Sequence, residues 1–121
     1  MDKSIIYYID NIINEPIVPI CQKQLLKANL PIVSVSLKHP IDFGQNIFFN
    51  GRRSYPTMVR QIIIALERSI SDYVFFCVCD VLYHPSLFDF IPESSNIYYY
   101  NINNWRWDYP HDRIIQYSGL T

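Results

Sequence analysis

The hydrophobic positions along the chain alternate between two spacings. Residues 5–8 and 32–37 are short runs rich in Ile, Val and Tyr, residue types that favour β-strands. The segment between them has apolar residues at every third or fourth position from residue 17 to residue 28. This spacing predicts an α-helix that begins near Pro16 and ends near Asn29.

A second helix is predicted to begin after Ser54, a residue type that caps helix N-termini. Its buried face is expected to carry the apolar residues that recur at helical spacing, which are Tyr55, Met58, Val59, Ile62, Ile63 and Leu66. Residues 39–53 before it are rich in Gly, Asn and Pro and predict a loop. That loop is long enough to suggest a functional role.

The most informative segment is the apolar run at residues 73–79, which ends abruptly at Asp80. The run has no polar alternation, which predicts a strand buried on both faces. In open α/β sheets, ligands bind at the carboxyl ends of the strands, where Asp80 would lie. A carboxylate there can bind a divalent metal. The alternative is that Asp80 is an ordinary turn or helix-capping residue.

The order of strand, helix, strand, helix and strand predicts an α/β fold in one domain over residues 1–121. Such alternation is typical of an open, mainly parallel sheet with right-handed crossovers and flanking helices. Beyond Asp80, the pattern predicts a helical turn at residues 85–90 and strands at 96–100, 105–107 and 114–117.

Composition and charge narrow the classes of function. The formal net charge is −1 and the only adjacent basic pair is Arg52 and Arg53, which argues against a nucleic-acid partner. No apolar run approaches the ~20 residues of a membrane span, and no secretory signal pattern precedes the first strand. Three cysteines fit a reducing compartment. A cytoplasmic location without a membrane span is therefore expected.

A series of segments, taken in order, resembles GT-A type nucleotide-sugar glycosyltransferases near the family 2-like group. The segments are YYIDN (7–11), QKQLLKA (22–28), PIVSVSLK (31–38), SYPTM (54–58), DYVFFC (72–77), DVLYHPS (80–86) and NWRW (104–107). The resemblance covers nearly the whole chain. It implies a Rossmann-like GT-A sheet and transfer of a sugar from a nucleotide sugar to a hydroxyl of a sugar or glycan acceptor. A UDP-sugar donor is favoured over a GDP-sugar.

The resemblance also implies an acid-any-acid motif that binds Mn²⁺ or Mg²⁺ against the donor diphosphate. Here Val78 and Cys79 stand where the pattern has acidic or polar residues, so that only Asp80 remains as a metal ligand. Weakened metal dependence is therefore expected. The chain also looks truncated on the acceptor side. Two alternatives stay open: a non-catalytic nucleotide-binding or protein-interaction module, and a homodimer that completes the core.

Several polar residues are candidates for nucleotide-sugar binding at the sheet edge. Asp10 and Asn11 end the first predicted strand and could hydrogen-bond a nucleobase or ribose, although an Asx turn is an equal alternative. Lys38 ends the second strand and could contact the base or ribose, or be solvated. Arg53, next to Arg52, precedes the second helix and could bind the diphosphate, or belong to a solvated charge pair.

The C-terminal segment supplies candidates for sugar binding and catalysis. Trp105 and Trp107 would lie on one face of a strand and could stack on a sugar or a nucleobase, or form a wall of the core. Asp108 and Asp112 are candidates for the general base that activates the acceptor hydroxyl. Ordinary loop residues are the alternative for both aspartates.

The cysteines raise a rival hypothesis. Cys77 and Cys79 would share a strand face near His84, which suggests a zinc site or a nucleophilic Cys79. Zinc sites usually have four ligands at loop or turn spacing, and a Cys-x-Cys inside an apolar strand fits this poorly. Buried cysteines are mostly unreactive.

Overall fold

The computed structural model describes residues 2–12, 16–108 and 111–117. It consists of two compact units, Met1–Asp89 and Phe90–Thr121. Each unit has a sheet of its own, four-stranded in the first and two-stranded in the second. The expectation of a single domain remains a prediction.

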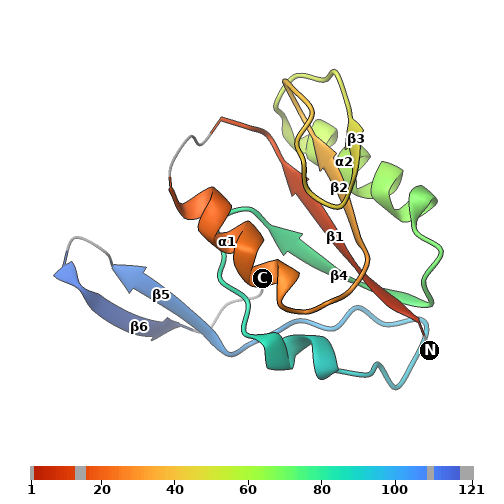
Figure 1. Cartoon of the computed structure of the whole chain (residues 1–121). Coiled ribbons are helices and arrows are strands. Elements are labelled where there is room, and N and C mark those ends of the chain that lie inside the picture. Colours follow the sequence, from red (N-terminus) through yellow and green to blue (C-terminus); the bar gives the residue numbers. More distant parts are fainter. Residues whose placement is uncertain (1, 13–15, 109–110, 118–121) are drawn as a thin grey trace. The chain divides into compact units, whose positions relative to one another are not determined.

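The first unit is an α/β fold, as predicted (Figure 1). Its strands form a sheet in the order β3-β2-β1-β4, and every neighbouring pair is parallel. Helices α1 and α2 cover opposite faces of this sheet. The elements are β1 (Lys3–Ile9), α1 (Ile17–Leu26), β2 (Ile32–Ser36), β3 (Gln45–Phe48), α2 (Tyr55–Arg68), β4 (Tyr73–Val78) and the 3₁₀ helix η1 (Pro85–Asp89).

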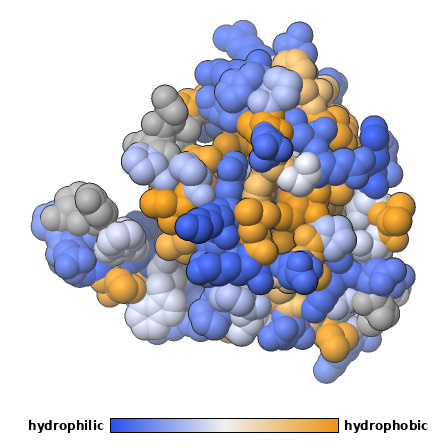
Figure 2. Space-filling model, viewed as in Figure 1, coloured by the Kyte–Doolittle hydropathy of each residue, from blue (hydrophilic) through white to orange (hydrophobic). Residues whose placement is uncertain are grey.

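Strand β1 is the centre of the core because its side chains point alternately to the two faces of the sheet and are buried on both. Ile5 and Tyr7 pack against Leu25 of α1 and against η1, whereas Ile6 packs against Ala65 of α2. This is the period-2 alternation that a strand covered on both faces requires. On the face seen in Figure 2, hydrophobic residues gather over the strands beside α1.

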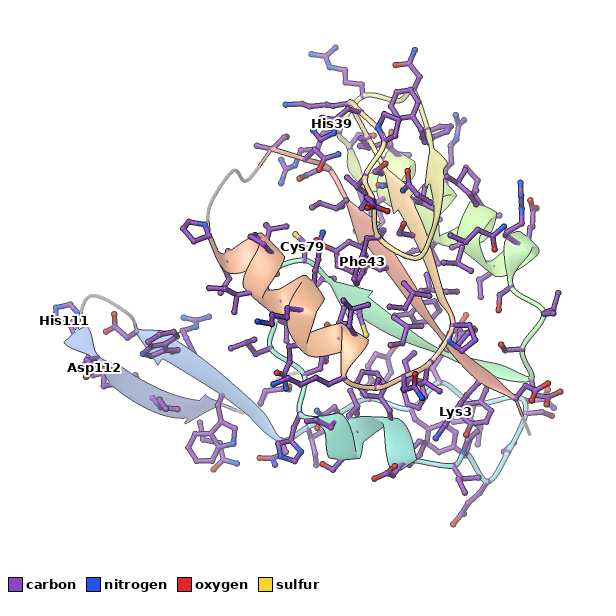
Figure 3. The ribbon with its side chains drawn as sticks, in the orientation of Figure 1. Lys3, His39, Phe43, Cys79, His111 and Asp112 are labelled. Carbon is purple, nitrogen blue, oxygen red and sulfur yellow. The ribbon has the colours of Figure 1, made fainter. Side chains whose placement is uncertain are left out.

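Strand β3 lies within residues 39–53, where the sequence predicted only a loop, so that prediction was incomplete. Asn46 fastens β3 to β2, since its Nδ2 donates to Ser34 Oγ (3.0 Å) and to Ser36 Oγ (3.2 Å). Ser34 Oγ in turn donates to the carbonyl of Phe43 at 2.6 Å. Phe43 points toward β1, where its ring meets Tyr7 edge-on at 4.8 Å (Figure 3). Side-chain hydrogen bonds thus define this strand as much as apolar periodicity does.

Strand β4 is an edge strand, and the prediction that it is buried on both faces was wrong. Its one strand neighbour in the described sheet is β1. Cys77 is fully buried, but Phe76, on the opposite face, is 38% exposed. Continuous hydrophobicity therefore did not indicate two covered faces. The turn that holds Cys79 and Asp80 does follow the strand directly, as expected.

Helix α2 begins as predicted but rests on the sheet by a different face. Ser54 caps it, and its Oγ accepts from the Thr57 N–H at 3.2 Å. The buried residues of the helix are Gln61 and Ala65. The predicted face was wrong for Tyr55, Val59, Ile63 and Leu66, which are exposed, whereas Met58 and Ile62 are half-buried. The small Ala65 lets the helix approach the sheet, and hydrogen bonds of Gln61 to β1 and β2 fix its rotation.

The second unit contains a hairpin of β5 (Asn104–Asp108) and β6 (Arg113–Tyr117). The bounds of these strands agree to within a residue with those predicted at 105–107 and 114–117. The strand predicted at residues 96–100 is absent from the described backbone. The Tyr99 hydroxyl accepts instead from the backbone N–H groups of Glu93 (3.2 Å) and Ser94 (3.0 Å). Its ring also lies 5.1 Å from that of Phe90. These local contacts keep the segment irregular despite its β-favouring residues.

Within the described ranges, neither α1 nor α2 combines the length and the hydropathy that a membrane-crossing helix needs.

Candidate functional site

The sheet has a topological switch point between β1 and β4. The chain leaves β1 toward β2 and β3 on one side, then returns through α2 to place β4 on the other side of β1. In open α/β sheets the crevice outside the carboxyl ends of two such strands is the usual ligand site. The molecule has a cavity of about 400 Å³ there. Its lining consists of Tyr8, Ile9, Asp10, Leu37, Arg53, Ser54, Tyr55, Met58, Gln61, Val78, Cys79 and Asp80.

Asp10 and Arg53 form an ion pair at this cavity. Arg53 Nε lies 2.6 Å from Asp10 Oδ2, and the two side chains are 69% and 24% exposed. Asp10 Oδ1 also accepts from the Ile12 N–H at 3.1 Å, which is the Asx turn considered as an alternative. Burial opposes ionisation of Asp10, but the Ile12 hydrogen bond and the Arg53 guanidinium outweigh it and lower its pKa. Asp10 is therefore an anion at neutral pH, with a cationic neighbour at the mouth of the cavity.

Asp80 lines the same cavity as Asp10 and lies in the turn after β4. It makes no hydrogen bond or ion pair with any residue in the described ranges, so both oxygens are open to a ligand. The described residues contain no group of three or more His, Cys, Asp or Glu side chains placed to bind a metal ion. One open carboxylate fits a hydrated Mg²⁺ or Mn²⁺ that takes further ligands from substrate phosphates.

Gln61 is a buried polar residue that lines the cavity, and it was not among the site residues predicted from the sequence. The side chain is only 3% exposed. Its Nε2 donates to two carbonyls at the ends of strands, that of Ile9 at 3.2 Å and that of Val35 at 3.0 Å. A polar residue inside an apolar helical pattern was the available signal, because a buried amide needs partners.

Cys79 is the accessible cysteine of the cavity, since Cys21 and Cys77 are buried. Burial, and then the negative charges of Asp80 and Asp10, raise the pKa of the Cys79 thiol to about 11. The nucleophile is the thiolate, so Cys79 is poorly suited to nucleophilic catalysis near neutral pH. Figure 3 shows it at the carboxyl end of β4.

Two predicted ligand residues do not line the cavity. Asn11 adopts a left-handed backbone (φ 59°) and donates from Nδ2 to the carbonyls of Leu37 (2.6 Å) and His39 (3.2 Å). It therefore joins the ends of β1 and β2. Lys38 also has a positive φ of 68° and is exposed beyond the end of β2. The structure thus brings Asp10, Arg53 and Asp80 together and leaves Asn11 and Lys38 at the rim of the sheet.

The remaining candidates belong to the second unit. Trp105 and Trp107 are exposed on β5, so neither forms the core wall considered as an alternative. Asp108 Oδ2 is contacted by His111 Nδ1 at 2.9 Å and accepts from Arg113 Nε at 3.0 Å. Asp112 is exposed at the turn of the hairpin, with φ 46°. Of the two proposed bases, Asp108 already has partners, and Asp112 faces solvent.

Comparison of the chain with protein-family models, with curated proteins and with solved structures finds no match in any of the three.

Proposed function

We propose that this chain binds a nucleotide diphosphate sugar in the cavity between β1 and β4, as a glycosyltransferase-like protein of the GT-A type. The reaction would transfer the sugar to a hydroxyl of a sugar or glycan acceptor, with a UDP-sugar favoured over a GDP-sugar as donor. The observation that carries the proposal is the position of Asp10, Arg53 and Asp80 around one cavity at the switch point of a parallel sheet.

Each of these residues suits a different part of such a ligand. The Asp10 carboxylate can accept hydrogen bonds from ribose hydroxyls. The guanidinium of Arg53 is exposed at the mouth and can pair with phosphate oxygens. Both lie near the first turn of α2, where the helix dipole favours an anion.

A divalent metal fits this cavity only together with the substrate. Asp80 would supply one ligand, while phosphate oxygens and water would supply the others. Such a metal would stabilise the departing diphosphate. We accordingly expect binding of the nucleotide to depend on Mn²⁺ or Mg²⁺, but less strongly than in a site with two free carboxylates.

Asp108 and Asp112 are the candidates for the catalytic base. Asp112 is a better candidate than Asp108, because Arg113 and His111 contact the Asp108 carboxylate. Trp105 and Trp107 of the second unit present exposed aromatic faces, which are surfaces on which sugars stack.

A second candidate is a non-catalytic nucleotide-binding module. The observation that favours it is Val78, an apolar residue that lines the cavity where the resemblance has an acid. The partner of such a module would be a second copy of the chain, which would cover the edge strand β4 and the exposed apolar residues of α2.

Calorimetric titration of UDP and of GDP, each with and without Mn²⁺, tests the proposal. We expect UDP to bind more tightly with Mn²⁺, and we expect Asp80→Ala to abolish the effect of the metal. Asp42→Ala removes an exposed carboxylate that does not line the cavity and is the matched control. A folded protein that binds neither nucleotide would refute the proposed function. Nucleotide binding that is the same with and without Mn²⁺, and the same in Asp80→Ala, would favour the non-catalytic module.

A further inference from the structure

Gln61 is a polar side chain whose hydrogen bonding is only half complete. Both hydrogens of its amide nitrogen are used, because Nε2 donates to the carbonyls of Ile9 and Val35. These two acceptors also fix the orientation of the amide: a flipped side chain would turn Oε1 toward two carbonyl oxygens. Oε1 is left as an acceptor, and no side chain or backbone group in the described ranges donates to it.

The position of this acceptor distinguishes it from the other polar groups of the cavity. Gln61 is 3% exposed, whereas the Asp10 side chain is 24% and the Arg53 side chain 69% exposed. The carboxylate and the guanidinium are therefore more open to solvent than Gln61. Half-buried Tyr8 and Met58 line the same cavity. A flat ring can pack on the Met58 side chain, whereas the ribose and phosphates belong nearer the charged side chains of Asp10 and Arg53.

We propose that Gln61 Oε1 accepts a hydrogen bond from the ring N–H of a uracil-type base, and so selects the base of the nucleotide. This inference rests on the proposed function, because it assumes that the cavity binds a nucleotide. Uracil has a ring N–H between two carbonyls. Cytosine has a bare ring nitrogen at that position, which would place two acceptors against each other.

The Tyr8 hydroxyl supplies a complementary donor. Tyr8 lines the same cavity, and its hydroxyl makes no hydrogen bond with a residue of the described ranges. Burial raises the pKa of Tyr8, so the hydroxyl keeps its proton at neutral pH. It is therefore available to donate to a carbonyl of the base. Tyr8 and Gln61 thus bring one donor and one acceptor to the same cavity, and the edge of uracil alternates between these two kinds of group.

Titration of the wild-type protein with UDP, CDP and N3-methyl-UDP tests the inference without any mutation. We expect UDP to bind about tenfold or more tightly than the other two, because neither of them presents a ring N–H to the Gln61 oxygen. Affinities for the three nucleotides within about twofold of one another would overturn the role of Gln61 and leave the proposed function standing. If none of the three nucleotides binds to the folded protein, the role of Gln61 and the proposed function are both refuted.

A pair of matched variants gives a second readout. Gln61→Met removes the acceptor, and we expect it to reduce the preference for UDP over CDP to near unity. Gln24→Met makes the same change on α1, where Gln24 Nε2 donates to the Tyr83 carbonyl at 3.2 Å outside the cavity. We expect the control to keep the full preference. A Gln61→Met protein that folds and still prefers UDP tenfold would contradict the inference.

Discussion

Replacing Leu25 by alanine should lower the free energy of unfolding by about 3 kcal/mol. Leu25 is fully buried and is the main anchor of α1 on the face of the sheet that carries Ile5 and Tyr7. Truncation removes its transfer free energy and leaves a cavity, because the β-strand backbone beneath it cannot close the gap. Urea unfolding followed by far-UV circular dichroism measures the loss.

The neighbouring Leu26 is the matched control. It is 58% exposed on the same helix, so Leu26→Ala should change the stability by no more than about 0.5 kcal/mol. Equal losses in the two variants would mean that α1 is rotated relative to the arrangement described above.

Gly44→Ala should destabilise the protein by about 2 kcal/mol or more. Gly44 has φ +61°, a backbone conformation that alanine adopts at a cost. A Cβ at this position would also lie 2.5 Å from the carbonyl oxygen of Ile32, a backbone atom that cannot move without disturbing β2. The loop that precedes β3 would have to shift, and the packing of Phe43 on Tyr7 would shift with it. Thermal unfolding measures the effect.

Gly51→Ala is the control, because alanine at residue 51 would crowd a neighbouring side chain without requiring a positive φ. Its Cβ would collide with the ring of Phe49, and a side chain can rotate away where a backbone carbonyl cannot. We therefore expect a smaller loss of stability than for Gly44→Ala. A Gly44→Ala protein as stable as the wild type would refute the assigned conformation of the loop before β3.

The fold class and the place of the cavity could be predicted from the sequence because both follow from the order of the elements. One apolar run ends at Asp80 and another ends at Asp10. Because the two strands are parallel, both carboxylates lie at the same edge of the sheet. The edge position of β4 could not be predicted in this way. Hydrophobicity reports that a strand is apolar, but it does not report whether a neighbouring strand covers it.

Details that depend on side-chain hydrogen bonds could not be predicted from the sequence either. Strand β3 is fastened by Asn46, and the buried face of α2 is set by Gln61. Asn and Gln count as polar in any periodic pattern, so their burial is visible only when their partners are in place. Asn11 was assigned to the ligand for the same reason, whereas its amide is used by the carbonyls of Leu37 and His39.

The protection of Cys79 from alkylation tests most directly whether the ligand occupies the cavity between β1 and β4. Cys79 lines that cavity, whereas Cys21 and Cys77 are buried. The experiment measures the rate of iodoacetamide labelling near pH 9 by mass spectrometry, with and without saturating UDP and Mn²⁺. Orthophosphate at the same concentration is the control. We predict that UDP slows the labelling of Cys79 severalfold. An unchanged rate under conditions where UDP is bound would place the nucleotide elsewhere and contradict the account.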